Sequence, residues 1–191
     1  MDRKYKLLTV FILVALVQLY IPTKMIIDSE GVLDSGTAYK FKTAPVDPTD
    51  PFRGKYITLR YKNNRVEVEK ESDWMSGEEI YVILSKDKDG FAGIKSISKE
   101  APQYKVDYFK AKIRYVTSNG SNQVQIAYPF NRYYMEESKA EAAEKAYRKS
   151  QADTSKVAYA LVSIKDGEAV LKDVLIDGVS IKDIVEKERG E

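Results

Sequence analysis

From residue 47 to residue 61 the chain reads Asp47-Pro48-Thr49-Asp50-Pro51-Phe52-Arg53-Gly54-Lys55-Tyr56-Ile57-Thr58-Leu59-Arg60-Tyr61. Each Asp-Pro step biases its aspartate towards extended backbone, and Gly54 can adopt the positive φ that other residues resist. Alternation then gives the strand two faces, with Ile57, Leu59 and Tyr61 on one and Tyr56, Thr58 and Arg60 on the other. We therefore predict a turn with a preset backbone that leads into a strand, and we expect Leu59 and Tyr61 to be core residues.

The composition restricts the chemistry that this protein can perform. The 191 residues include no Cys and no His, which excludes disulfides, thiolate zinc sites and Ser-His or Cys-His catalytic pairs. We expect no metal site and no cofactor. Lys and Arg number 31 and Asp and Glu 29, so the net charge of +2 gives no broad positive field for a phosphate backbone, and we expect no nucleic-acid partner.

An apolar run near the N-terminus predicts a membrane anchor. Asp2, Arg3, Lys4 and Lys6 precede the run Leu7 to Ile21, which with its extension to Ile27 is long enough for a bilayer. We divide the chain into an anchor at residues 1–27 and a folded domain at residues 28–191. A cleaved signal peptide is the alternative, although residues 21–27 offer no small-residue cleavage site. A buried core helix is another, but it would not need to be apolar all round.

The charges before the apolar run predict the orientation. Positive residues stay on the cytoplasmic side, so the domain should lie outside the cytoplasm. We expect a single-pass protein of the bacterial inner membrane, with the lipid bilayer as one partner.

The remaining chain predicts an α+β, β-rich fold built from antiparallel hairpins. Strand patterns occupy residues 38–42, 55–61, 79–85, 91–98, 110–115, 124–128, 157–164 and 169–176. Residues 80–84 and 157–164 are apolar on both faces, as central strands are. Turn residues at 87–90, 119–120 and 166–167 join neighbouring strands into hairpins.

Two helices are expected among these strands. Residues 135–150 carry an Ala140, Ala143 and Tyr147 stripe, which predicts one longer amphipathic helix. Ser180 and Asp183 predict the start of a shorter helix.

The order of strands also suggests two similar halves, at residues 38–100 and 105–180. Residues 81–92 and 158–169 share an apolar strand, a Lys-Asp turn, a glycine and a following alanine. Ordinary hairpin chemistry can produce the same pattern by chance, so internal duplication and coincidence both stay open.

Two clusters are candidate binding sites. In the first, Asp47, Asp50, Arg53 and Gly54 precede Tyr56, so two carboxylates, a guanidinium and a phenol would gather near one turn. The structural alternative is that the aspartates form Asx-type turns and Tyr56 covers the second face of the sheet.

The second cluster runs from Phe130 to Glu137, between the last two hairpins. A functional interpretation puts Arg132 or Glu137 across a groove from Tyr56. Stabilisation of Glu136 and Glu137 by the helix dipole is a sufficient structural explanation.

The signature strand closely resembles that of the GDYXXLXY protein family. Gly54, Tyr56, Leu59 and Tyr61 match the Gly-Asp-Tyr-x-x-Leu-x-Tyr pattern, while Lys55 stands where the family has aspartate. Residues 130–137 look like the family's second recurring region. The resemblance implies a membrane-associated protein that acts beside a multi-pass membrane protein. The change at Lys55 removes support for metal binding or proton transfer by that carboxylate.

Three functions follow as expectations. We expect a membrane-anchored accessory or binding module that docks a membrane protein or an envelope ligand, with no catalytic residue assigned. The alternative is a cell-envelope hydrolase that uses carboxylates such as Asp50 and Glu137, which requires a fixed separation between them. A structural spacer is the third.

Overall fold

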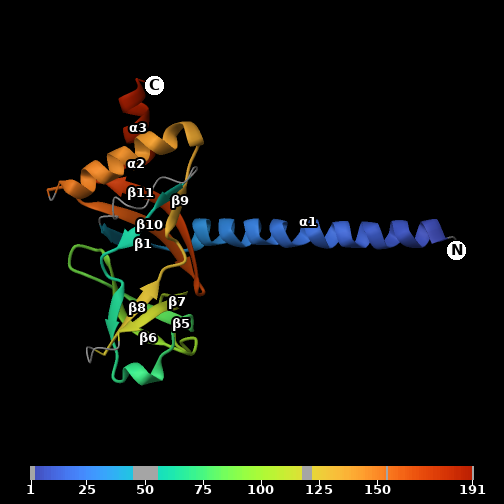
Figure 1. Cartoon of the computed structure of the whole chain (residues 1–191), viewed down its shortest axis with the longest axis horizontal. Coiled ribbons are helices and arrows are strands. Elements are labelled where there is room, and N and C mark those ends of the chain that lie inside the picture. Colours follow the sequence, from blue (N-terminus) through green and yellow to red (C-terminus); the bar gives the residue numbers. More distant parts are fainter. Residues whose placement is uncertain (1–2, 45–55, 118–121, 154, 191) are drawn as a thin grey trace.

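The computed structural model describes residues 3–44, 56–117, 122–153 and 155–190. Helix α1 (Arg3–Ser35) has 33 residues and contains Pro22. At 1.5 Å per residue it is about 50 Å long, and it leaves the domain as a straight arm (Figure 1). It is long and apolar enough to cross a bilayer, and no part of its most apolar window is buried. The predicted N-terminal apolar helix is confirmed, and it continues beyond residue 27 to Ser35.

The end of α1 is attached firmly to the domain. Val32 is buried, and the helix contacts strands β10 (Ala158–Lys165) and β11 (Glu168–Ile176). The Lys165 ammonium donates a hydrogen bond to the Ser35 hydroxyl at 2.8 Å. Gly36 follows, and a Cβ there would lie 2.4 Å from the Val32 carbonyl oxygen and 3.1 Å from the Ile164 backbone. Only glycine allows this close approach, so the arm has a defined direction.

Two five-stranded sheets and a two-stranded ribbon form the domain. The first sheet has the order β12 (Val179–Ser180), β11 (Glu168–Ile176), β10 (Ala158–Lys165), β1 (Thr37–Ala44) and β3 (Arg60–Tyr61). The second has the order β4 (Arg65–Glu67), β8 (Gln123–Ala127), β7 (Tyr108–Thr117), β5 (Glu79–Lys86) and β6 (Ala92–Ser98). The ribbon pairs β2 (Tyr56–Thr58) with β9 (Arg132–Tyr134). The named strand pairs are antiparallel, so the predicted β-rich α+β fold is confirmed.

Helices close one end of the domain (Figure 1). Helix α2 (Glu137–Ala152) buries Ala140, Ala143 and Tyr147, the stripe that the sequence predicted. Helix α3 (Ile181–Arg189) packs against α2, and the Ser180 hydroxyl caps it by accepting from the Lys182 N–H. A 3-10 turn, η1 (Glu71–Asp73), lies between β4 and β5.

The sheets exchange strands between the two predicted halves. Strand β1, from the first half, pairs with β10 of the second, and β7, from the second, pairs with β5 of the first. Each five-stranded sheet therefore combines three strands of one predicted half with two strands of the other. The boundaries at residues 38–100 and 105–180 stay a prediction.

The β5–β6 and β10–β11 hairpins share the position of a β-bulge. Both hairpins carry a bulge five residues after the turn glycine, at Lys95 and at Lys172. Phe41 pairs with Ala160, whose partner on the other side is Val174, two residues after the bulge at Lys172. Phe109 pairs with Val82, whose partner on the other side is Ile97, two residues after the bulge at Lys95. The two hairpins thus share this local geometry, and the similarity of the halves stays a prediction.

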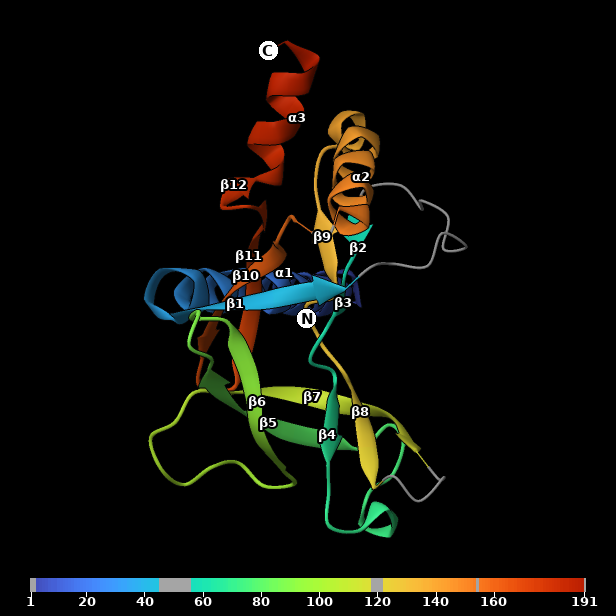
Figure 2. The same ribbon diagram turned by 90° about the vertical axis from the view of Figure 1, so that its left-hand side faces the viewer.

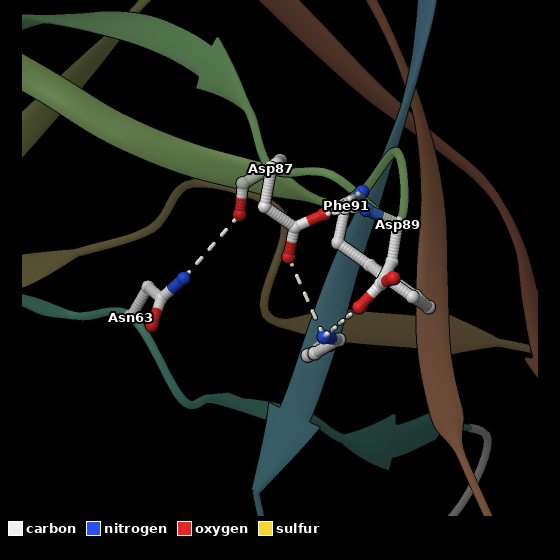
Figure 3. A network of polar contacts seen from close by, with 6 residues as sticks. Asn63, Asp87, Asp89 and Phe91 are labelled. Carbon is white, nitrogen blue, oxygen red and sulfur yellow. Dashed lines mark hydrogen bonds and ion pairs between the residues drawn. The ribbon is translucent and has the colours of Figure 1, made fainter.

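A salt bridge to a hairpin turn also occurs twice. The Lys42 ammonium lies 3.4 Å from the Asp87 carboxylate in the β5–β6 turn, and that of Lys110 lies 3.2 Å from the Glu168 carboxylate beside the β10–β11 turn. In the first turn, shown in Figure 3, the Asp87 carboxylate accepts from the Asp89 and Phe91 N–H groups. The residues 87–90 therefore form the turn that the sequence predicted.

The core lies between the two sheets and is centred on Phe41. Its ring lies 5.0 to 6.5 Å, centroid to centroid, from five other aromatic rings, those of Tyr39, Tyr61, Phe109, Tyr128 and Phe130. All six side chains are buried. Edge-to-face pairs of this kind add to the stabilisation that burial of apolar area provides.

Replacement of Phe41 by Ala should lower the free energy of unfolding by about 3–5 kcal/mol, because it removes a buried ring and leaves a cavity at the centre of the cluster. Chemical denaturation of the full-length protein in detergent micelles measures the change. Tyr104→Ala is the control, since the Tyr104 side chain is 62% exposed and should change stability by less than about 0.5 kcal/mol. Equal effects of the two substitutions would contradict the assigned core.

The buried tyrosines predict a loss of stability at alkaline pH. Burial, with a smaller contribution from the hydrogen bond to Asp107, raises the pKa of Tyr39 to about 12, and burial raises that of Tyr147 to about 12. Tyrosines in an unfolded chain ionise at about 10. The stabilisation is therefore complete below about pH 10 and is lost as the pH rises through 12.

Denaturation curves measured between about pH 9 and pH 12 should show this fall, and ultraviolet absorbance should show phenolate formation lagging behind that of free tyrosine. Stability that stays constant over the same range would contradict the prediction.

Candidate functional site

The signature strand changes sheets at Leu59. Before it, β2 pairs with β9, and after it, β3 pairs with β1. The Leu59 N–H donates to the Asn131 carbonyl at 2.8 Å, and the Tyr61 hydroxyl donates to the Phe130 carbonyl at 2.6 Å. Leu59 and Tyr61 are both buried, as predicted. These two signature residues therefore hold the crossing between the sheets and are not available for binding.

The outward face of the ribbon carries a stacked cluster of Tyr56, Arg132 and Tyr134. Tyr56 pairs with Tyr134 in the β2–β9 register, and their ring centroids are 5.4 Å apart. The Arg132 guanidinium lies 4.9 Å from the Tyr56 ring centroid. Its hydrogen bond with Tyr134 and the nearby phenol of Tyr56 raise the pKa of Arg132. We call this group the Tyr56 cluster.

The other face of the ribbon fixes it to the domain. Ile57 and Tyr133 are paired across the two strands and both are buried. The Tyr133 hydroxyl donates to the Asp173 carboxylate of β11 at 2.8 Å, and burial together with this bond raises the pKa of Tyr133. The ribbon lies beside α2, which contacts β2 (Figure 2). The strands that carry the Tyr56 cluster are therefore held in place by the buried residues on their other face.

Only some of the predicted site residues lie close together in the structure. Tyr56 and Arg132 are brought together as stacked neighbours on adjacent strands, whereas the sequence-based interpretation put them across a groove. The reason is that residues 132–134 form a strand, which the sequence analysis treated as part of a connection. Glu137 is exposed and is the first residue of α2. Four further predicted residues lie outside the described part of the chain: Asp47, Asp50, Arg53 and Gly54.

Tyr134 is the member of the cluster that the sequence analysis did not select. Its side chain is 62% exposed, the largest exposure among the tyrosines of the folded domain together with Tyr104. The alternation Arg132-Tyr133-Tyr134, with one buried residue between two exposed ones, was the available signal. A three-residue strand is too short for that alternation to be distinguished from a loop.

The Tyr56 cluster exposes polar and aromatic groups side by side. Within residues 3–44, 56–117, 122–153 and 155–190, no group of three acidic side chains could hold a metal ion. The hydrolase alternative named Asp50 with Glu137, and Asp50 is not among the described residues. A guanidinium that lies over the Tyr56 ring and is hydrogen-bonded to Tyr134 offers donors, a positive charge and neighbouring apolar area, groups that suit recognition.

The architecture of the chain and a comparison with known proteins together identify its family. The chain combines a helix that is long and apolar enough to cross a bilayer with a β-rich domain that contains the signature strand. The chain belongs to the family described as GDYXXLXY protein, whose model matches residues 18–174. No curated protein and no solved structure matched the chain.

The two signature tyrosines should respond differently to truncation. Tyr61→Ala should lower the free energy of unfolding by about 3–5 kcal/mol, because it removes a buried ring and leaves the Phe130 carbonyl unpaired. Tyr56→Ala should cost only about 1 kcal/mol, the value of a cross-strand aromatic pair on a partly exposed face. Denaturation of the full-length variants measures both, and a cost for Tyr56→Ala as large as that for Tyr61→Ala would return Tyr56 to the core.

Proposed function

We propose that this protein is a single-pass, membrane-anchored docking module. Its domain lies outside the cytoplasm of a bacterial cell, above the inner membrane, and the Tyr56 cluster binds an exposed segment of a multi-pass membrane protein. No reaction is catalysed in this proposal.

The long helix supports the anchored arrangement. Lys4 and Lys6 precede the apolar run, as expected for a cytoplasmic N-terminal tail. An ion pair between Lys24 and Asp28, at 2.6 Å, lies near the other end of the run, where charged side chains can reach the interface. Because the helix continues to Ser35 and is fixed to β10 and β11, the domain would be held at a set distance and direction from the bilayer.

The stacked, exposed Tyr56 cluster is the observation that carries the proposal. Tyr and Arg are the residue types enriched at the energetic centres of protein interfaces. Their positions are preset by the strand pairing and by the buried face of the ribbon, so binding would cost little side-chain entropy. The guanidinium favours a carboxylate or carbonyl group on the partner, and the rings favour an apolar neighbour.

Site-specific photo-crosslinking in living cells tests the proposal. A crosslinking amino acid replaces Tyr134 in the full-length protein, and the same amino acid replaces Tyr104 in a control with an equally exposed side chain, 62% in each case. We expect one dominant adduct from position 134 that mass spectrometry identifies as a protein with several membrane spans. The position 104 variant should not give this adduct.

Arg132→Gln in the position 134 variant should reduce the adduct by about tenfold, which corresponds to about 1.4 kcal/mol of binding energy. Expression and membrane insertion of this variant should be unchanged, because the Arg132 side chain is exposed. Equal adducts from positions 134 and 104, or none from a well-expressed protein, would overturn the docking function.

A further inference from the structure

A second surface of the domain is a polar groove of about 870 Å³. It runs between the crossing segment at residues 59–65 and the outward face of the second sheet. Four cationic side chains line it: Arg60, Lys62, Arg65 and Arg114. Its other polar side chains include Asn63, Asn64, Gln125 and Asn131, and no carboxylate lines the groove in the described part of the chain.

A β-bulge adds to the charge of this groove. Ile113 pairs with Ile126 and Tyr115 pairs with Gln125, so Arg114 is an extra residue in β7. The bulge puts two consecutive side chains, Arg114 and Tyr115, on the exposed face, where a regular strand would turn every second residue inward. Arg65 pairs with Gln125 from the other side, so β4, β8 and β7 present their side chains to the same groove.

The crossing segment is held in place by bonds from the groove floor. The Tyr128 hydroxyl donates to the Asn63 carbonyl, and the Ile126 N–H donates to the Asn64 carbonyl at 2.8 Å. Asn63 donates to the Ala92 carbonyl at 3.4 Å (Figure 3). Arg60, Lys62 and Arg65 therefore extend from a backbone that is ordered before any ligand arrives.

The cations of the groove differ from other cations of the domain in their lack of described acidic partners. The four cations form no ion pair with any side chain that the structure describes. In the neighbouring cavity, by contrast, Lys110 pairs with Glu168 at 3.2 Å and Lys112 with Glu79 at 3.7 Å. These four positive charges, which pair with no acidic side chain in the described ranges, repel one another and attract an anion, on a chain whose net charge is only +2.

The type of anion follows from the donors. Three of the four cations are arginines, whose planar forks bind phosphate and carboxylate oxygens in pairs. A phosphate group offers more acceptor oxygens and more charge than a carboxylate. It can therefore accept hydrogen bonds from guanidinium groups on different strands and from the amide side chains of the groove at the same time. Cations on three strands also suit a ligand with several phosphates.

We propose that this groove binds the phosphate groups of an extended anionic ligand. Two sources share this chemistry, namely a soluble phosphate polymer and the headgroups of anionic phospholipids. This surface differs from the Tyr56 cluster, and the proposal does not depend on the docking function.

Two measurements on the full-length protein in phosphatidylcholine nanodiscs test the proposal. Calorimetric titration with inorganic polyphosphate reports the soluble source, and flotation with vesicles that contain phosphatidylglycerol reports the lipid source. Arg65→Gln with Arg114→Gln should weaken whichever binding is present by at least about tenfold and reduce its salt dependence. Lys145→Gln with Lys149→Gln removes the same charge from exposed positions on α2 and is the matched control.

Binding to either probe that the groove substitutions weaken and the control substitutions do not would support the site and identify its source. Four results would overturn the proposal. These are no binding to either probe, equal loss in both double variants, no loss in the groove variant, and tighter binding of poly-glutamate than of polyphosphate at equal charge.

Discussion

The contact between the rings of Phe41 and Phe109 is the interaction on which the domain depends. The two rings meet edge to face with centroids 6.1 Å apart, one from each sheet. Each lies on a strand that pairs with the buried hairpin from the other half of the chain. The two sheets therefore bury apolar side chains in one shared core. The hydrogen bond from Tyr39 to Asp107, at 2.8 Å, joins the same two segments beside the rings.

The signature strand is a consequence of this packing. At Leu59 its chain passes from the β2–β9 ribbon into the first sheet, and it then continues to β4 of the second. This passage is held where Tyr61 bonds to the Phe130 carbonyl and packs 4.7 Å from the Tyr128 ring. The residues of the signature thus have two different environments. Leu59 and Tyr61 close the core, while Tyr56 faces outward on the ribbon with Arg132 stacked on its ring.

The two candidate surfaces arise on either side of the same crossing. Residues before Leu59 pair with β9, and this ribbon presents aromatic groups with one guanidinium. Residues after Tyr61 run beside β8 and present cations that pair with no acidic side chain among the residues that the structure describes. Ion pairs neutralise the neighbouring face at Lys110 and Lys112, so the positive field is local even though the net charge of the chain is small. The firm attachment of α1 at Val32 would hold both surfaces at fixed orientations to the bilayer.

Local patterns were enough to identify the apolar helix, the hairpins and the Ala140, Ala143 and Tyr147 stripe, because each depends on side-chain periodicity or turn chemistry within about twenty residues. They also placed Leu59 and Tyr61 in the core, since alternation along one strand separates its faces. The exchange of strands between the halves depends on pairings that no local pattern specifies: Phe41 pairs with Ala160, more than a hundred positions away, and Val82 pairs with Phe109 of β7 rather than with another strand of its own half. For the same reason only the folded chain reveals that Arg132 stacks on Tyr56, that the bulge at Arg114 turns a charge outward, and that four cations share one groove.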